Sequence, residues 1–355
     1  MSDLAPSPSD KHSSDPERKG LCLVTGATGF IGGRLATRLA QAGHPVRAMA
    51  RRSSDTSQLE QLDNVEIAIG DLTDASSLAQ GAKGCELVFH CAALVSDWAT
   101  VEEIKRINVV GTRSLLDACT AASVKRLIHI STTDVYGHPD TRGAVDESYT
   151  SHTFSNWYAQ SKLEAEAEVR RAGEQGLEAV ILRPATVYGP GSREVIGEIS
   201  RAIRSRNMLL VDRGRADAGL CYVENLIDAL LIASGHESAP GEAYNISDGL
   251  TTTWRELVDD LAVGLGAPPV RWSLPYGVAA ALGLLMEHGY RLLRRTTGLS
   301  APPLLSRQAV QVLGRNQSFS NRKARDLLGW EPSVDYDAGL EETIEWLRTS
   351  YLQPT

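Results

Sequence analysis

A tyrosine and a lysine four residues apart suggest the first chemistry in this sequence. Tyr158 and Lys162 lie in the stretch NWYAQSK, residues 156–162, and Thr132 stands upstream. In a helix the two side chains share one face, one turn apart. A nearby ammonium lowers the pKa of a phenol, and such a phenol can exchange a proton with an alcohol or carbonyl oxygen. Tyr-x-x-x-Lys also arises by chance on helices, so the interpretation depends on the elements around it.

A glycine-rich turn indicates where a dinucleotide would bind. The apolar run 21–25 leads into Gly26, Gly29 and Gly32, and a helical pattern carrying Leu35 and Leu39 follows. Glycines between a strand and a helix let the backbone approach a pyrophosphate at the helix N-terminus. The alternative is a turn that is merely tight.

The end of the second expected strand bears on the type of cofactor. Residues 46–50 read as a strand, and Arg51 and Arg52 follow it. A carboxylate at this corner suits the ribose of NAD, whereas arginine suits the 2′-phosphate of NADP. The sequence therefore favours NADP over NAD, with two solvated turn arginines as the alternative.

The rest of the first half alternates strands with helices. Further strands are expected at residues 65–69, 87–90 and 126–130, with a helix over 104–121 that carries Asn108. This alternation predicts an α/β fold, a Rossmann-type doubly wound parallel sheet whose ligand cleft lies at the carboxyl ends of its strands. We expect a disordered tail over 1–18, an NAD(P)-binding domain over 19–188, and a smaller, mostly helical substrate-binding lobe over 189–350, interleaved with the last strands.

Composition narrows the class of protein. The 355 residues carry a net charge of −8 without a long basic run, so nucleic acid is not an expected partner. Five cysteines without a C-x-x-C pair argue against a metal site or a disulfide framework and favour a reducing, cytoplasmic compartment. The tail lacks a secretory apolar region, and the longest apolar run, 278–286, is too short to span a bilayer.

Seven motifs occur in an order typical of one family: TGATGFIG at 25–32, Gly70-Asp71-Leu72, HCAA at 90–93, Asn108, STTDVYG at 131–137, Tyr158 with Lys162, and Leu182-Arg183-Pro184. From about residue 20 to 346 the chain resembles an extended short-chain dehydrogenase/reductase of the NAD(P)-dependent epimerase/dehydratase superfamily.

The resemblance implies roles for four catalytic residues. Tyr158 would be the acid/base, and Lys162 would hold the nicotinamide ribose and lower the pKa of the tyrosine. Thr132 would hydrogen-bond the substrate oxygen, and Asn108 would support a water relay to the lysine. The family also implies a homodimer formed through the helices that carry Asn108 and Tyr158.

It implies a cofactor site as well. Asp71 would contact the adenine, and Arg51, with Arg52 second, would bind the 2′-phosphate. The other expected cofactor contacts, besides Tyr158 and Lys162, are Gly26, Thr28, Gly29, Phe30, Ile31, Gly32, Leu72, Ala92, Ala93 and Pro184.

The second half bears on the substrate. Nucleotide-sugar members of the family usually bind the diphosphate with an asparagine and an arginine. This chain has Thr186 in place of the asparagine and Ala218 in place of the arginine. Arg213 and Arg215 lie close to Ala218 in the sequence and could substitute for the missing arginine. Dehydratases carry an Asp-Glu pair where Thr133-Asp134 stands, which argues against dehydration.

Other segments are similar to the 3β-hydroxysteroid dehydrogenase branch. They are Trp98, YVENL at 222–226, PPLL at 302–305, FSNRKA at 319–324 and LGWEP at 328–332. We expect Trp98, Thr133 and Thr186 to contact the substrate.

Residues 275–295 combine apolar side chains at helical spacing with three arginines near their end. They could form an apolar lid over a hydrophobic substrate, with membrane contact as an option. An ordinary packed helix with a cationic C-terminus is the interpretation that we favour over membrane contact.

Together these features predict an NAD(P)-dependent oxidoreductase that interconverts a secondary alcohol and a ketone on a hydrophobic, 3β-hydroxysteroid-like substrate. One alternative is a nucleotide-sugar epimerase with tightly held NAD(P). Another is a non-catalytic NADP-sensing protein.

Overall fold

The computed structural model describes residues 19–96, 98–137, 139, 143–150, 157–297 and 306–353, and it describes no side chains over 291–297. The expected tail over 1–18, Asn156 and the segment 302–305 lie outside the described residues, as do the side chains of the three arginines over 291–295.

A seven-stranded sheet forms the centre of the molecule, and all its pairings are parallel. The order of its strands is β10 (Ala243–Ile246), β6 (Glu178–Pro184), β5 (Arg126–Ile130), β4 (Leu87–His90), β1 (Cys22–Thr25), β2 (Val46–Ala50) and β3 (Val65–Ile69). Because the order reverses between β1 and β4, the carboxyl ends of these two strands open a crevice for a ligand. The predicted doubly wound parallel sheet is confirmed.

Most strands of this sheet are buried on both faces, which explains their continuous apolar runs. The edge strand β3 is only partly buried, and its Ile69 is 50% exposed. Leu23, Val88 and Leu127 belong to one hydrophobic core, whereas their neighbours Val24, Phe89 and Ile128 belong to the other. Successive side chains of a strand point to opposite faces, so one strand supplies both cores.

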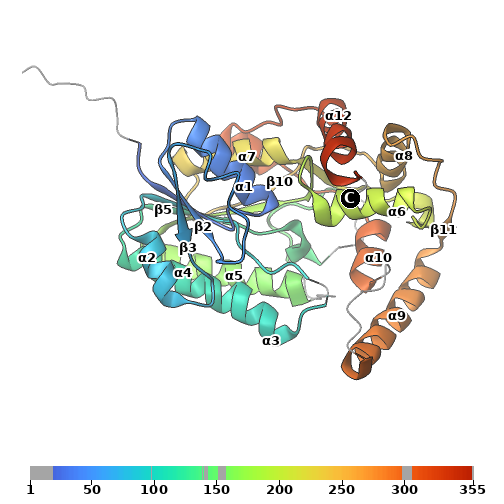
Figure 1. Ribbon diagram of the computed structural model, residues 1–355, viewed down its shortest axis with the longest axis horizontal. Helices are drawn as coiled ribbons and strands as arrows, with labels where there is room; N and C mark the ends of the chain where they lie inside the picture. Colours follow the sequence, from blue (N-terminus) through green and yellow to red (C-terminus); the bar gives the residue numbers. More distant parts are fainter. Residues whose placement is uncertain are drawn as a thin grey trace, which may run out of the picture.

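Helices cover both faces (Figure 1). One core includes residues of α1 (Phe30–Gln41) and α7 (Val223–Gly235); the other includes residues of α2 (Ala75–Ala82), α4 (Gly111–Ala121) and α5 (Trp157–Glu174). The expected helix over 104–121 begins earlier, with α3 (Val101–Ile104), because Thr100 and Glu103 form a capping box. A π-helical turn, Lys105–Val110, follows before α4.

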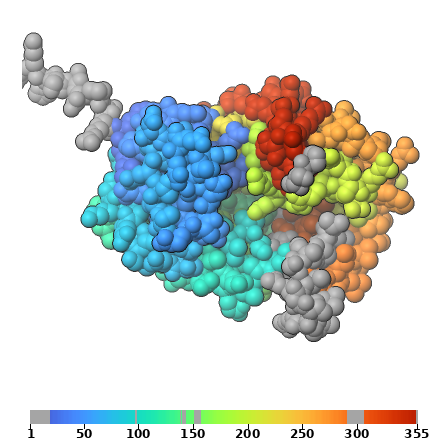
Figure 2. Space-filling model, viewed as in Figure 1, coloured from blue at the N-terminus to red at the C-terminus, as the bar shows by residue number. Residues whose placement is uncertain are grey.

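The C-terminal part is mostly helical, as predicted. Figure 2 shows that the surface is hollowed between the blue N-terminal half and the yellow-green to red segments. Its helices are α6 (Glu198–Arg204), α8 (Trp254–Gly264), α9 (Tyr276–Thr297), α10 (Arg307–Gly314), α11 (Arg322–Leu328) and α12 (Tyr336–Trp346). Two small sheets pair β7 (Thr186–Tyr188) with β9 (Leu220–Tyr222) and β8 (Leu210–Val211) with β11 (Ser273–Leu274). Short helical turns span Thr133–Tyr136, Arg193–Gly197, Asp212–Gly214 and Leu347–Tyr351. The domain boundary at 188/189 stays a prediction.

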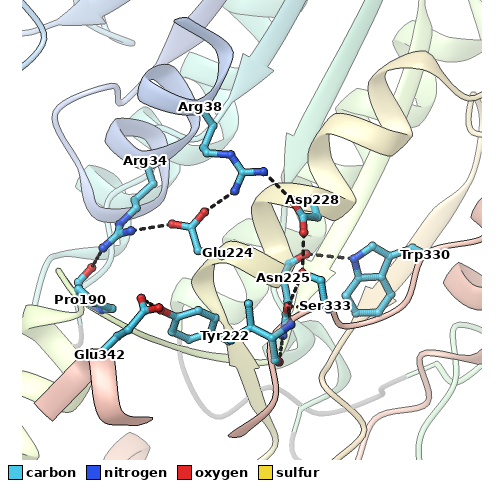
Figure 3. Close-up of polar contacts among 11 residues, drawn as sticks. Arg34, Arg38, Pro190, Tyr222, Glu224, Asn225, Asp228, Trp330, Ser333 and Glu342 are labelled. Carbon is cyan, nitrogen blue, oxygen red and sulfur yellow. Dashed lines mark hydrogen bonds and ion pairs between the residues drawn. The ribbon is translucent and has the colours of Figure 1, made fainter. Parts of the chain in front are cut away.

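The segment 222–225 fastens the C-terminal segment to the sheet domain (Figure 3). The Asn225 Oδ1 atom accepts hydrogen bonds from the backbone N–H groups of Ser333 and Val334, at 3.0 and 2.9 Å, and its backbone carbonyl accepts one from Trp330 Nε1. Tyr222 donates its hydroxyl to Glu342. These contacts give the YVEN element a structural role.

The same element ties α7 to α1. Arg34 and Arg38 each bind the Glu224 carboxylate at 2.6 Å, and Arg38 also binds Asp228 at 2.8 Å (Figure 3).

Helix α9, which contains most of residues 275–295, has one packed face and one exposed apolar face. Ala279 and Tyr290 are buried, and Glu287 forms an ion pair with Arg307 of α10 at 2.8 Å. Its other side remains exposed, with Val278, Leu282, Leu284, Leu285 and Met286 between 39% and 68% accessible. Simple packing therefore accounts for only one face of this helix. In the parts of the chain that the structure describes, no helix has the length and apolar character needed to cross a membrane.

Candidate active site

The glycine turn after β1 is built for close backbone approach. Gly26 has a φ of +67°, and a Cβ atom there would lie 2.9 Å from the backbone of Ala92. A Cβ atom on Gly32 would lie 2.2 Å from the Gly26 carbonyl oxygen, so only glycine lets α1 start against this turn. Gly29 precedes α1 without a capping side chain, which leaves the N–H groups of its first turn available to an anion.

The loop that follows β7 packs against this turn. Gly191 has a φ of +103°, and a Cβ atom there would lie 2.9 Å from the Phe30 ring. Arg34 donates to the carbonyl of Pro190 at 3.2 Å. Phe30 and Ile31 are half-buried, whereas Thr28 is exposed. The predicted cofactor turn thus meets a loop of the C-terminal part.

The corner after β2 and β3 gathers charges. Arg51 and Arg52 are both exposed. The pKa of Asp71 is lowered first by hydrogen bonds from Thr73 and then by the charges of Arg51 and Arg106. Arg51 and Asp71, predicted at the 2′-phosphate and the adenine, therefore lie close enough to interact.

Asn108 connects two parts of the site. Its amide exchanges hydrogen bonds with the Leu94 backbone, Oδ1 accepting at 2.7 Å and Nδ2 donating at 3.0 Å. Nδ2 also donates to Ser161 Oγ at 3.0 Å, and Ser161 Oγ donates to the Tyr158 carbonyl at 2.7 Å. Asn108 therefore holds the loop after β4 against the first turn of α5. Its backbone carbonyl accepts a hydrogen bond from Thr112 Oγ1 at 2.7 Å.

Lys162 is buried, and its ammonium points to the end of β5. Nζ donates to the Ile130 carbonyl at 2.5 Å and lies 3.5 Å from His129 Nε2. Burial lowers the pKa of Lys162 to about 8, against the opposing influence of Glu166 and Cys91.

The pKa of Tyr158 corrects one expectation. Tyr158 is half-buried, and its pKa is raised, first by desolvation and then by the carboxylates of Asp134 and Glu194. We expected Lys162 to lower this pKa. In this structure the lysine ammonium binds the Ile130 carbonyl, and the charges acting on the phenol are negative.

Thr132 lies at the carboxyl end of β5, as predicted. Its Oγ1 accepts from the backbone N–H of Asp134 at 3.1 Å at the start of the turn Thr133–Tyr136. Of the expected substrate contacts, Thr186 is partly exposed, whereas Thr133 has only 3% of its surface accessible. Pro184 is buried at the end of β6.

Two contacts bring α9 and α10 to this site. Trp98 packs edge-on against Tyr290 of α9, with ring centroids 4.7 Å apart. Gln308 of α10 donates to Asp134 Oδ2 at 3.5 Å. Sequence reasoning missed Tyr290 and Gln308, because no motif places these two helices near the catalytic stretch.

A buried polar network supports α5 from behind. Arg183 binds the Glu166 carboxylate through both Nε and Nη2, at 2.8 and 2.6 Å, and donates to the Tyr136 hydroxyl at 2.8 Å. Ser131 Oγ donates to Glu166 at 2.6 Å, and the Tyr136 hydroxyl donates to Asn245 at 2.7 Å. The position of Glu166, four residues after Lys162, was an available signal for this role.

Arg213 and Arg215 do not join the site. They line a separate depression with Arg255, Arg271 and Trp272, among other residues, and none of the expected catalytic or cofactor residues lines it. The structure thus gives no support to these arginines as substitute diphosphate anchors. Within the described residues, no group of three His, Cys, Asp or Glu side chains is arranged to hold a metal ion.

Comparison with known proteins places this geometry in a family. Residues 22–247 match the NAD dependent epimerase/dehydratase family. The chain is 33% identical over 322 residues to a 4-hydroxy-2-methyl-3-oxo-4-farnesyl-3,4-dihydroquinoline-1-oxide ketoreductase of Stigmatella aurantiaca, covering 90% of this chain and 94% of that protein. It is 30% identical over 347 residues to a 3-beta-hydroxysteroid dehydrogenase of Mycolicibacterium neoaurum, covering 92% and 91% of the two chains.

A solved structure of MoeE5 in complex with UDP-glucose and NAD is similar too, with a TM-score of 0.73, 26% identity and coverage of 93% and 99%. The chain therefore belongs to the NAD dependent epimerase/dehydratase family and is an NAD(P)-dependent oxidoreductase of the extended short-chain dehydrogenase/reductase type.

Proposed function

We propose that this protein reduces a ketone on a hydrophobic substrate to a secondary alcohol, with Tyr158 as the proton donor and NADPH as the preferred cofactor. The observation that carries the proposal is the position of Tyr158, one turn before Lys162 on α5, a helix that Asn108 and Ser161 hold to the loop after β4. In the described parts of the chain, no residue hydrogen-bonds the Tyr158 hydroxyl, which leaves the phenol available to a substrate oxygen.

The protonation state of Tyr158 is compatible with reduction. Its pKa is raised, first by desolvation and then by Asp134 and Glu194, so the side chain is a protonated phenol at neutral pH and can donate to a carbonyl oxygen. When bound, the nicotinamide supplies the hydride that the carbonyl carbon accepts. Thr132 would orient the carbonyl oxygen toward Tyr158, and Lys162 would hold the ribose beside it.

Three features support a hydrophobic substrate. Trp98 and Tyr290 present an aromatic wall, and Ala218, at the place of the expected diphosphate arginine, is fully buried. The relatives named for a farnesylated quinoline and for a hydroxysteroid point to the same class of compound.

The cofactor preference rests on Arg51 and its proximity to Asp71. The MoeE5 structure contains NAD, which keeps NAD as the competing cofactor.

Two accompanying proposals concern assembly and compartment. Trp157, Leu163 and Val110 are 44%, 36% and 49% exposed on or beside the helices that carry Tyr158 and Asn108, which supports a homodimer through these helices. The five cysteines are all free, which supports a reducing compartment such as the cytoplasm.

The test is the change in nicotinamide absorbance with purified protein, NADPH or NADH, and a panel of steroid and other apolar ketones. We expect turnover that is faster with NADPH and lost in Tyr158→Phe, while the variant still binds cofactor. Turnover of a UDP-sugar, with cofactor that copurifies and resists washing, would instead establish the epimerase alternative. Cofactor binding without turnover of any ketone, alcohol or UDP-sugar would favour the NADP-sensing alternative.

A further inference from the structure

We propose that the depression lined by Arg213, Arg215, Arg255 and Arg271 is a second ligand site, which binds a compound that carries both phosphate groups and an aromatic ring, such as a nucleoside triphosphate. The depression has a volume of about 900 Å³, and Thr253, Glu256, Trp272 and Ser273 complete its lining. The inference does not depend on the reaction proposed above, because no catalytic or cofactor residue belongs to this lining.

Charge is the first argument. Four guanidinium groups line the depression of a chain whose net charge is −8. Within the described part of the chain, the guanidinium groups of Arg213, Arg215 and Arg271 form no ion pair. Glu256, the carboxylate among the lining residues, already accepts hydrogen bonds from the N–H and hydroxyl of Thr253 at 2.7 and 2.9 Å. Clustered guanidinium groups repel one another, and a phosphate offers each of them a bidentate partner.

The depression is also held together by defined contacts. Arg255 Nε donates to the Arg213 carbonyl at 3.3 Å, and Nη1 donates to the Val270 carbonyl at 2.7 Å. The backbone N–H of Arg213 donates to Ser273 Oγ at 2.7 Å. The turn after β8, the start of α8 and the segment before β11 are therefore fixed relative to one another.

The turn after β8 has an unusual backbone. Asp212, Arg213 and Gly214 have φ values of +44°, +63° and +71°. A Cβ atom on Gly214 would lie 2.8 Å from the Arg255 backbone nitrogen, so glycine allows the turn to reach the first turn of α8. Positive φ is unfavourable for the other two residues. This conformation sets Arg213 and Arg215 on either side of Gly214, beside the first turn of α8.

Trp272 is the residue of this lining that could stack on an aromatic ring of the ligand. It is 73% exposed at the edge of the charged residues. An exposed indole gains most from a planar ring that stacks on it, and nucleobases are such rings. Phosphates for the arginines and a base for the tryptophan define a nucleotide-like ligand.

The experiment is calorimetric titration of the full-length protein with ATP, inorganic triphosphate and adenosine, with tryptophan fluorescence as a second readout. We expect triphosphate to bind with an affinity that falls as salt rises, and ATP to bind at least tenfold more tightly than triphosphate. The double variant Arg213→Ala/Arg215→Ala should weaken triphosphate binding at least tenfold while leaving NADP binding unchanged, which also shows that the variant is folded. Trp272→Ala should reduce the advantage of ATP over triphosphate and leave triphosphate binding within about twofold.

The matched control is Arg51→Ala/Arg52→Ala, which removes the same charge at the expected cofactor corner. It should weaken NADP binding and leave triphosphate binding unchanged. The proposal is overturned if triphosphate fails to bind the wild-type protein, or if both double variants weaken its binding equally. An unchanged ATP advantage in Trp272→Ala would overturn the aromatic part. None of these outcomes depends on ketone turnover.

Discussion

Ser161 Oγ lies 3.0 Å from Asn108 Nδ2 and donates to the Tyr158 carbonyl at 2.7 Å, so one hydroxyl joins the helical turn of Asn108 to the first turn of α5. Ser161 is 1% exposed and cannot replace these partners with solvent. We therefore expect Ser161 to position Tyr158, the proposed proton donor.

We expect Ser161→Ala to lower kcat for ketone reduction by about tenfold and to destabilise the protein by about 1–3 kcal/mol, because the Asn108 amide loses a buried partner. The KM for the cofactor should change little. Steady-state kinetics and urea denaturation measure the two effects. Ser205→Ala, which removes an exposed hydroxyl bonded to the Ala202 carbonyl, is the control. Equal effects of both variants would contradict a positioning role.

Asp134 should contribute to the pH dependence of the reaction. Desolvation is the main cause of the raised pKa of Tyr158, and the negative charge of Asp134 adds to it, so Asp134→Asn should lower that pKa. Alcohol oxidation requires the phenolate, and its rate should therefore begin to rise at lower pH in the variant. Ketone reduction requires the phenol, and its rate should begin to fall at lower pH.

Rate profiles across pH in both directions measure these shifts. Glu194→Gln should shift the profiles in the same direction by a smaller amount, because the Glu194 carboxylate raises the pKa of Tyr158 less than the Asp134 carboxylate does. Asparagine keeps a carbonyl that Gln308 can bind, so loss of that contact should not confuse the result. Profiles that shift to higher pH would exclude this electrostatic role.

Much of the fold could be predicted because most strands of the sheet are buried on both faces and therefore carry apolar runs. The strands over 46–50, 65–69, 87–90 and 126–130 have the bounds that their apolar runs indicated. The glycine spacing likewise indicated the turn, since the contact between Gly32 and Gly26 is local.

What could not be predicted depends on distant segments. Four-residue spacing placed Tyr158 and Lys162 on one helix, but it did not show that the ammonium would bind the Ile130 carbonyl, 32 residues away in the chain. The contact between Gln308 and Asp134 spans 174 residues and has no motif. The charges around Tyr158 depend on such contacts, and for this reason the predicted direction of its pKa shift was wrong.

The ion pair of Glu166 with Arg183 should contribute strongly to stability. Both side chains are buried, at 1% and 7% exposure, and Glu166→Gln would leave the Arg183 charge without its carboxylate. We expect a loss of about 3–5 kcal/mol in the free energy of unfolding. Asp326→Asn, which breaks the exposed pair with Arg322, should cost at most about 1 kcal/mol. Urea denaturation of both variants compares the two pairs, and similar losses would contradict the argument.

Arg51 should decide between the two cofactors. Its guanidinium lies near Asp71 at the ends of β2 and β3, where a 2′-phosphate would reach it. A hydrogen bond between charged groups contributes about 1.5–3 kcal/mol, so Arg51→Ala should raise the Kd of NADPH about tenfold to a hundredfold. The Kd of NADH should stay within about twofold, because NADH lacks the 2′-phosphate.

Fluorescence titration of both cofactors into wild-type and variant protein measures this difference. Arg52→Ala is the matched control, with the smaller effect expected from the neighbouring exposed arginine. If Arg51→Ala weakened the binding of NADPH and NADH equally, the arginine would have a general role at the adenine end of the cofactor and no role in choosing between the two. A wild-type protein that already prefers NADH would show that the carboxylate of Asp71 outweighs both arginines at this corner.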